Sequence, residues 1–203
     1  MDQHHTSLDQ MASGRWHMPG STELTAEQMR SAQVLRRLNE LGNTQPDAAR
    51  ELVRELTGAE HAEATIIAPA MVEYGRHLHL GEGVFINAGV TILSSAHVHI
   101  GDHTMIGPNC QLLTVGHPVD DVDMRREGWE KAESITIGRD TWIGAGVVVL
   151  PGITIGDRVT IGAGSLVTRD IPSDSVAVGH PARVVRQRSP ERAAAERAEL
   201  TQE

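Results

Sequence analysis

The stretch ITIGRDTWIGAGVVVLPGITIGDRVTIGAGSLVT, residues 135–168, decides the fold of this chain. Branched aliphatic residues recur in it at every sixth position, and most of them are followed directly by glycine. The aliphatic residues are Ile137, Ile143, Val149, Ile155, Ile161 and Val167. An α-helix repeats every 3.6 residues or so and a strand with one buried face every two, so neither fits this spacing. A branched aliphatic residue before a small one, at a period of six, predicts a hexapeptide β-helix.

The same period occurs upstream. The series is Leu80, Ile86 and Ile92, then, after a slip of two residues, Ile100, Ile106 and Leu112. If each hexapeptide supplies one side and one corner of a triangular coil, aliphatic residues eighteen positions apart stack at the strand spacing of about 4.8 Å. Glycine after the aliphatic residue fits a corner that accommodates only small neighbours. An ordinary β-sandwich with glycine-rich turns is the alternative, but it does not explain runs in strict register.

The segments that flank the repeat have a different pattern. Apolar residues at helical spacing predict one helix over 22–42 and a second over 46–58, with Pro46 at its start and Gly58 at its end. The C-terminal tail is expected to be a charged, exposed helix or an extension without fixed structure. The expected organisation is an N-terminal helical cap over 1–60, a β-helix over 61–187 and a charged tail over 188–203.

Composition excludes several classes of function. Lys and Arg number 18 against 27 Asp and Glu, a formal charge of -9, which disfavours nucleic acid as a partner. The single cysteine, Cys110, fits a reducing compartment. No apolar run is long enough to span a membrane, and the first ten residues lack the order of a signal peptide. These features predict a cytoplasmic protein with no membrane partner.

The repeat is interrupted at TVGHPVD, residues 114–120, and resumes about two dozen residues later. A stacked coil has no room for a reacting group and its substrate, whereas a loop can hold both. Residues 113–134 are therefore expected to protrude from the β-helix as a loop that presents His117.

Four motifs extend the interpretation from fold to family. They are FINAGVTIL (85–93), IGPNCQLLTVGHPVD (106–120), the repeat of 135–168, and VGHPARVVR (178–186). Together they resemble the maltose/galactoside O-acetyltransferases of the hexapeptide-repeat acyltransferase superfamily, over residues 11–187. The resemblance implies a mainly β fold, namely a left-handed parallel β-helix, assembled as a homotrimer. It also implies acetyl-CoA as co-substrate, a hydroxyl of a sugar or similar small molecule as acceptor, active sites between adjacent subunits, and no metal.

His117 is the expected general base. A hydroxyl is a poor nucleophile, so attack on a thioester needs a group that removes its proton, and imidazole is available in neutral form near pH 7. The alternative is an ordinary surface histidine in a long loop. The resemblance assigns Asn87 to the acceptor region, where an amide can orient a hydroxyl, although a structural asparagine at a coil corner would look the same. It assigns the oxyanion donor to the backbone amide at Ala145.

The resemblance also implies a binding site for acetyl-CoA. Trp142 would lie beside the donor groove, although it could equally pack between subunits. Arg183 and Arg186 would meet the coenzyme phosphates, because guanidinium groups suit phosphate oxygens; the alternative is that both are solvated. The expected acetyl-CoA-binding residues are Trp142, Ala145, Ala163, Thr168, Arg169, Arg183 and Arg186.

The acceptor side departs from the family pattern. Glu73 stands where the family commonly has Asp or Ser, Gly89 replaces a second asparagine, and the acidic residues expected near 18–20 and 94–95 are missing. Glu73 and Trp129 are still candidate acceptor-binding residues, and Trp129 could stack on a sugar face or simply anchor the loop. The acceptor itself is therefore left open.

Rival hypotheses concern histidines and assembly. His79 and His97, like His99 and His117, are eighteen residues apart, so each pair is expected to stack on one face. Stacked histidines raise the possibility of a metalloenzyme like the γ-class carbonic anhydrases, which share the fold, but the spacings do not match that family. A non-catalytic scaffold and a xenobiotic acetyltransferase of the same superfamily are the remaining alternatives.

Overall fold

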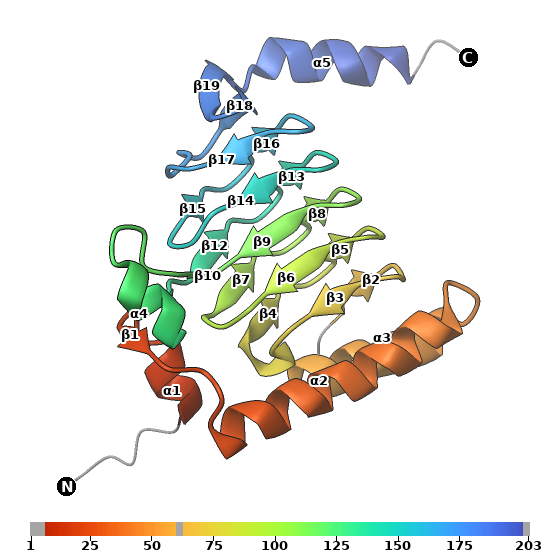
Figure 1. Ribbon diagram of the computed structural model, residues 1–203. Coiled ribbons are helices and arrows are strands. Elements are labelled where there is room, and N and C mark those ends of the chain that lie inside the picture. The colour runs from red at the N-terminus through yellow and green to blue at the C-terminus, as the bar shows by residue number, and fades with distance from the viewer. Residues whose placement is uncertain (1–6, 60–62, 201–203) are drawn as a thin grey trace, which may run out of the picture.

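A computed structural model describes residues 7–59 and 63–200 of the chain (Figure 1). Its centre is a triangular prism of short parallel strands stacked coil on coil. Face I consists of β2 (Thr65–Ile66), β5 (Phe85–Ile86), β8 (Met105–Ile106), β13 (Trp142–Ile143), β16 (Thr160–Ile161) and β18 (Ser175–Gly179), with β19 (Ala182–Gln187) added antiparallel. Face II consists of β3 (Met71–Val72), β6 (Thr91–Leu93), β9 (Gln111–Leu113), β14 (Val148–Val149) and β17 (Leu166–Val167). Face III consists of β4 (Leu78–Leu80), β7 (Val98–Ile100), β12 (Ile135–Ile137) and β15 (Thr154–Ile155).

The aliphatic residues of the repeat form the core of this prism. All six members of the series from Ile137 to Val167 are at most 1 % exposed. The strand register stacks Ile143 on Ile161 and Ile137 on Ile155, so the eighteen-residue spacing is confirmed there. Burial of each such side chain contributes about 1.5–3 kcal/mol. The prediction of a parallel β-helix of hexapeptide repeats is confirmed.

Glycine follows the aliphatic residues because the coils approach one another closely. A Cβ added to Gly138 would lie 2.6 Å from the backbone nitrogen of Asp157 in the next coil, and one added to Gly144 would lie 2.6 Å from that of Ala163. Neither glycine has a positive φ. The small residue is thus required by the stacking distance and not by backbone conformation.

The slip of two residues in the upstream repeat has a local cause. Ile66 is in register with Ile86, and Ile86 with Ile106, so each of these coils has twenty residues. In the first coil the extra residues lie in η1 (Gly75–His77), and in the second they lie at Ser94 and Ser95. Both insertions, and the long one over 113–134, occur at the corner that follows face II. We call this the insertion corner.

The N-terminal cap has the helices that the sequence predicts. They are α2 (Thr22–Leu41) and α3 (Pro46–Thr57). The Ser21 hydroxyl caps α2 by accepting from the Leu24 amide, and Gly58 ends α3 in the left-handed conformation. Apolar residues of both helices pack onto the first coil and extend the core of the prism, which closes the end of the β-helix (Figure 1).

The protruding segment is more ordered than the expected loop. It contains β10 (Val115–Gly116), α4 (Val122–Glu127) and β11 (Glu130–Ala132). The N-terminal arm, α1 (Ser7–Met11) and β1 (Trp16–His17), lies against it, because β1 pairs with β11 and β11 with β10 in an antiparallel sheet. The insertion thus has its own three-stranded sheet, one strand of which comes from about a hundred residues upstream.

The C-terminal tail forms α5 (Pro190–Glu199), a charged helix with no buried residue. Of the two expectations for the tail, the exposed helix is therefore the one that the structure has. Among the residues described, no helix combines the length and apolar character needed to cross a bilayer. The domain boundaries at 60 and 187 stay a prediction.

Candidate active site

His117 lies at the insertion corner, directly after β10. Its Nδ1 is 3.1 Å from the carbonyl oxygen of Trp129. A carbonyl can only accept, so Nδ1 carries the proton of the neutral ring and Nε2 has the free lone pair. The side chain is 52 % exposed in the single chain. His117 therefore presents an unprotonated nitrogen, held in a fixed ring orientation, at an accessible position.

Two carboxylates lie at the same corner. Glu130, in β11, has one oxygen 3.9 Å from Nε2 of His117 and the other 3.9 Å from Nε2 of His17. Glu73, which follows β3, accepts hydrogen bonds from the Ser95 hydroxyl and the Gln28 amide. Burial raises the pKa of Glu73, and the charge of Glu130 raises it further against the hydrogen bonds that lower it. Glu130 thus links the predicted acceptor residue Glu73, on which its charge acts, to the predicted base His117.

His17 and Glu130 were not singled out from the sequence. His17 reaches the site only because β1 pairs with β11, which puts His17 opposite Glu130. Its Nε2 is buried and, among the described residues, has no hydrogen-bond partner. Strands of two and three residues, paired across such a long stretch of chain, leave no periodic signal.

The other predicted acceptor residues have different surroundings. Trp129 is half-buried and its indole N–H donates to Glu127, while its backbone carbonyl holds His117. Anchoring of the loop is therefore visible, and sugar stacking stays a prediction. The side-chain oxygen of Asn87 accepts from the Ala88 amide, which fixes the orientation of its amide group.

Asn87 does not meet His117 within this chain. Asn87, Ala145 and Ala163 all follow strands of face I, at the corner we call the donor corner. The carbonyl of Ala145 accepts from Gly164, so these residues are stacked coil on coil. The N–H of Ala145 makes no hydrogen bond within the described part of the chain, as an oxyanion donor requires.

The two arginines Arg183 and Arg186 lie on β19, the last strand of face I. In the β18–β19 hairpin Val178 is opposite Arg183 and Val176 is opposite Arg186, because the register shifts between Val176 and Ala177. Residues three apart on a strand normally point to opposite faces, and the bulge puts these two on the same face. Val176 is in turn in register with Thr160, and Thr160 with Trp142. Both guanidinium groups and the 54 % exposed Trp142 therefore belong to the outer surface of face I.

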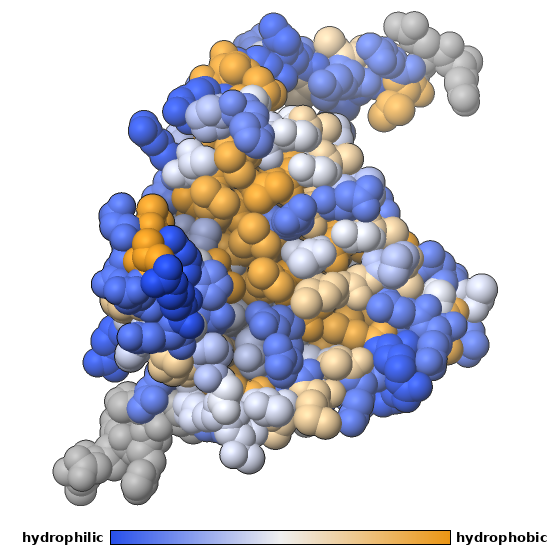
Figure 2. All heavy atoms as spheres, in the orientation of Figure 1, coloured by the Kyte–Doolittle hydropathy of each residue, from blue (hydrophilic) through white to orange (hydrophobic). Residues whose placement is uncertain are grey.

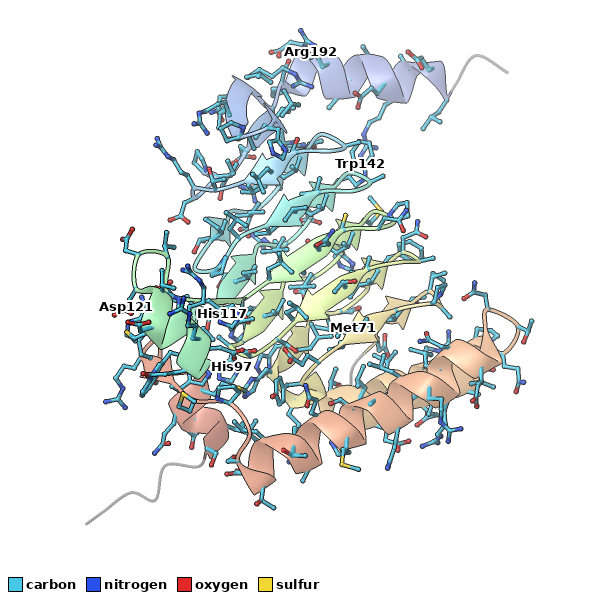
Figure 3. All side chains as sticks on the ribbon, in the orientation of Figure 1. Met71, His97, His117, Asp121, Trp142 and Arg192 are labelled. Carbon is cyan, nitrogen blue, oxygen red and sulfur yellow. The ribbon has the colours of Figure 1, made fainter. Side chains whose placement is uncertain are left out.

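The remaining two donor candidates lie elsewhere. Thr168 and Arg169 follow β17 of face II, and thus belong to the insertion corner with Glu73 and His117. Figure 3 shows His117 beside α4 and Trp142 at the opposite edge of the prism. The candidate site of one chain is therefore divided between two corners, and neither corner has the complete set.

The expected histidine stacking is wrong in detail. His79 is in register with His99, at a ring separation of 4.5 Å, because that coil has twenty residues and not eighteen. His79 still contacts His97 through a hydrogen bond. His99 does not stack on His117, since the next residue in its column is Thr136 and His117 has left the coil. The catalytic candidate is thus separate from the other histidines in the strand ladder.

Comparison with known families agrees with this geometry. The family described as "Bacterial transferase hexapeptide (six repeats)" matches residues 134–169, and the "Maltose acetyltransferase hexapeptide capping motif" matches residues 10–59. The first match covers the later coils of the prism, and the second covers the N-terminal arm with α2 and α3.

Relatives and solved structures extend the match to nearly the whole chain. A galactoside O-acetyltransferase of Lactococcus lactis subsp. lactis (strain IL1403) is 36 % identical over 172 residues, 84 % of this chain and 83 % of the relative. The crystal structure of a maltose O-acetyltransferase from Clostridium difficile 630 has a TM-score of 0.87 and 35 % identity, and covers 91 % of this chain and 98 % of its own.

A third comparison is with a hexapeptide-repeat acetyltransferase of Vibrio cholerae O1 biovar eltor, whose crystal structure contains acetyl coenzyme A. It has a TM-score of 0.82 and 33 % identity, covering 91 % of this chain and 99 % of that one. Taken together, these matches show that the chain belongs to the maltose/galactoside O-acetyltransferase family of hexapeptide-repeat acyltransferases.

Proposed function

We propose that the protein transfers an acetyl group from acetyl-CoA to a hydroxyl of a sugar or similar small acceptor, with His117 as general base. The observation that supports this most directly is the hydrogen bond from Nδ1 of His117 to the carbonyl of Trp129. In the neutral ring it leaves the lone pair of Nε2 free, 3.9 Å from an oxygen of Glu130. The family relatives, one of which holds acetyl coenzyme A in its crystal structure, support the donor.

The proposed reaction has two proton transfers. Nε2 of His117 takes the proton of the acceptor hydroxyl while the hydroxyl oxygen attacks the thioester carbon. The backbone N–H of Ala145 donates to the oxyanion of the tetrahedral intermediate. When the carbon–sulfur bond breaks, the imidazolium of His117 returns its proton to the departing thiolate. The products are the O-acetyl ester and free coenzyme A, and the base is regenerated.

We further propose that the working unit is a homotrimer, in which the insertion corner of one protomer meets the donor corner of the next. The division of candidate residues between two corners supports this, because a neighbour would complete the set. The outer surface of the prism also supports it. Hydrophobic side chains gather over β9, β14 and β17 of face II (Figure 2), where Val148 and Leu166 are only half-buried in the single chain.

The acceptor is proposed to bind at the insertion corner. Glu73 and Glu130 offer hydrogen-bond acceptors at this corner, and the Ser95 hydroxyl holds the carboxylate of Glu73 in place. Carboxylates bind sugar hydroxyls by accepting from them. Asn87, from the neighbouring donor corner, would orient the reacting hydroxyl, and Trp129 would contact a sugar face.

A thiol-release assay tests the proposal. The purified protein is incubated with acetyl-CoA and a panel of sugars and other polyols, with mass detection of the acetylated product. We expect acceptor-dependent release of coenzyme A that falls about 10²–10⁴-fold in His117→Ala. His103→Asn is a matched control, because His103 has a positive φ that asparagine tolerates and is outside the site. Unchanged turnover in His117→Ala would refute the assignment of the base, and absence of any acceptor-dependent thiol would favour a non-catalytic scaffold.

A further inference from the structure

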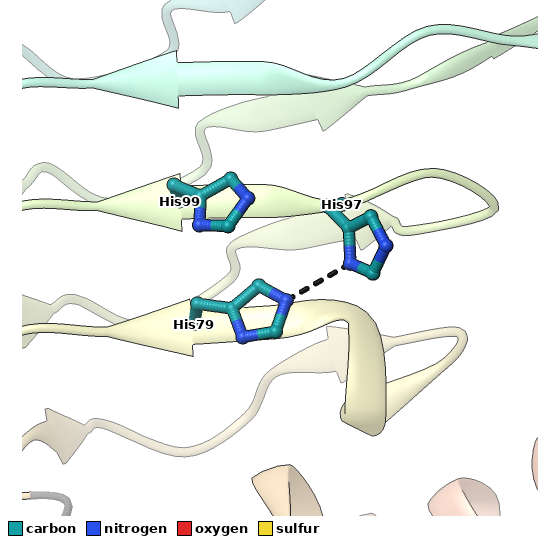
Figure 4. Close-up of side chains that lie close together, drawn as sticks. All are labelled: His79, His97 and His99. Atoms are coloured by element: carbon teal, nitrogen blue, oxygen red, sulfur yellow. Dashed lines mark hydrogen bonds between the residues drawn. The ribbon is translucent and has the colours of Figure 1, made fainter. Parts of the chain in front are cut away.

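Three histidines converge on the outer surface of face III, outside the proposed active site (Figure 4). His97 and His99 flank one residue at the start of β7, and His79 lies on the neighbouring strand β4. The rings of His79 and His99 are stacked at 4.5 Å with an interplanar angle of 13°. Nε2 of His79 is 2.9 Å from Nδ1 of His97. One nitrogen of each ring lies within 4.8 Å of the others.

The arrangement brings together three side chains of a kind that binds transition metals. Alternate residues of one strand and a register partner on the next present three imidazoles to one side. Three imidazoles are a sufficient protein ligand set for Zn²⁺, with a fourth position for water. Nitrogens on a tetrahedral zinc ion are about 3.4 Å apart, given Zn–N distances near 2.1 Å. His79 and His99 are exposed, so small rotations about their side-chain bonds can close the remaining distance.

Mutual hydrogen bonding does not explain the whole cluster. The contact between His79 and His97 satisfies one nitrogen of each ring, but His99 adds a third imidazole, which stacks on the ring of His79. The carboxylate of Asp9, in α1, also acts electrostatically on His97. A negative charge that acts on one of the three imidazoles favours a bound cation beside it.

We propose that His79, His97 and His99 bind one divalent transition-metal ion, with Zn²⁺ as the expected occupant. Because His79 belongs to the first coil and the other two ligands to the second, the ion fastens these coils together beside the N-terminal cap. The site takes no part in acetyl transfer, and the proposal does not depend on the proposed function.

Calorimetric titration of the full-length protein with Zn²⁺, after removal of metal with a chelator, tests the proposal. We expect one ion per chain in wild type, and affinity at least about 100-fold lower in His79→Asn and in His99→Asn, since each loses one of three ligands. Saturating Zn²⁺ should raise the Tm of wild type, since the ion binds only the folded state, and leave the Tm of the two variants unchanged. The Tm also verifies that each variant is folded.

Matched controls separate this cluster from other histidines. His103→Asn removes an exposed histidine of the same prism and should bind zinc as wild type does. His4, His5 and His61 lie outside the described residues, so a full-length variant with asparagine at all three is also expected to retain binding. The proposal would be overturned if the His79→Asn and His99→Asn variants bound zinc as tightly as wild type. It would also be overturned if zinc binding were lost when His4, His5 and His61 are replaced. Absence of wild-type binding at about 1 mM Zn²⁺ would overturn it too.

Discussion

At the scale of the residue, the environment of each side chain decides what it contributes. His117 and Glu73 have similar positions at the insertion corner, but their partners differ. The carbonyl of Trp129 fixes the ring of His117 so that one nitrogen stays free. Glu73 is placed where burial and the charge of Glu130 both disfavour its ionised form. Because the ionised form of Glu73 is disfavoured in the folded protein, we expect this carboxylate to have a role in the active site and not in stabilising the fold.

The raised pKa of Glu73 predicts a pH-dependent effect on stability. The native state holds the Glu73 proton at pH values where the unfolded chain has released it. This group's contribution to stability therefore falls as pH rises from the ordinary glutamate pKa of 4.5 through the raised native pKa. Glu73→Gln should therefore stabilise the protein at pH 7, and the difference should vanish near pH 4, where the native carboxyl is already protonated. Thermal unfolding at the two pH values measures it. A variant less stable than wild type at pH 7 would contradict the electrostatic argument.

At the scale of the element, each coil depends on contact with the next. A Cβ on Gly138 would meet the backbone at Asp157 and Gly156, which cannot move without separating two coils. Gly138→Ala should cost about 1–3 kcal/mol. A Cβ on Gly116 meets nothing within 4 Å, and its φ is not positive, so Gly116→Ala is the matched control and should change the free energy of unfolding little. Urea denaturation distinguishes the two. Equal losses would show that the close approach of the coils is not what requires glycine at position 138.

The sequence predicts those parts of the structure that leave a repeated or local signal, and it misses the others. The coils follow from a period of six, since every rung repeats the same contact. The cap follows from helical spacing and end signals such as Pro46 and Gly58. The sheet in the insertion has neither kind of signal, because β1 pairs with β11 across a hundred residues. His117 was found through its motif, whereas His17 and Glu130 depend on that pairing and were missed.

The hairpin of β18 and β19 supports a prediction about the coenzyme. The bulge directs Arg183 and Arg186 to one surface, continuous with Thr160 and Trp142. Arg183→Gln and Arg186→Gln should each raise the KM for acetyl-CoA about tenfold, the loss of one charge-assisted contact to phosphate, with little change in kcat. Arg192→Gln, on the exposed helix α5, is the control and should leave the KM unchanged. A fall in kcat alone would assign these arginines to the chemical step instead.

At the scale of the whole molecule, the prism keeps the proposed groups apart. The insertion corner has His117 and Glu73, the donor corner has Asn87 and Ala145, and face II lies between them. A solenoid cannot bend to bring two of its own corners together, because its interior is packed from end to end. If the proposed residues act together, catalysis therefore requires a second copy of the chain.

Mixed assemblies make this requirement measurable. His117→Ala and Asn87→Ala should each be inactive alone, but co-expression at equal levels should restore activity. In a trimer with sites between protomers, a site is intact when its insertion corner comes from the Asn87→Ala chain and its donor corner from the His117→Ala chain. Random assembly gives about one quarter of sites this composition. The double variant co-expressed with His117→Ala is the control and should stay inactive, since no chain then supplies the base. If both groups acted within one chain, every mixed assembly would be inactive, and the division of the site between protomers would have to be abandoned.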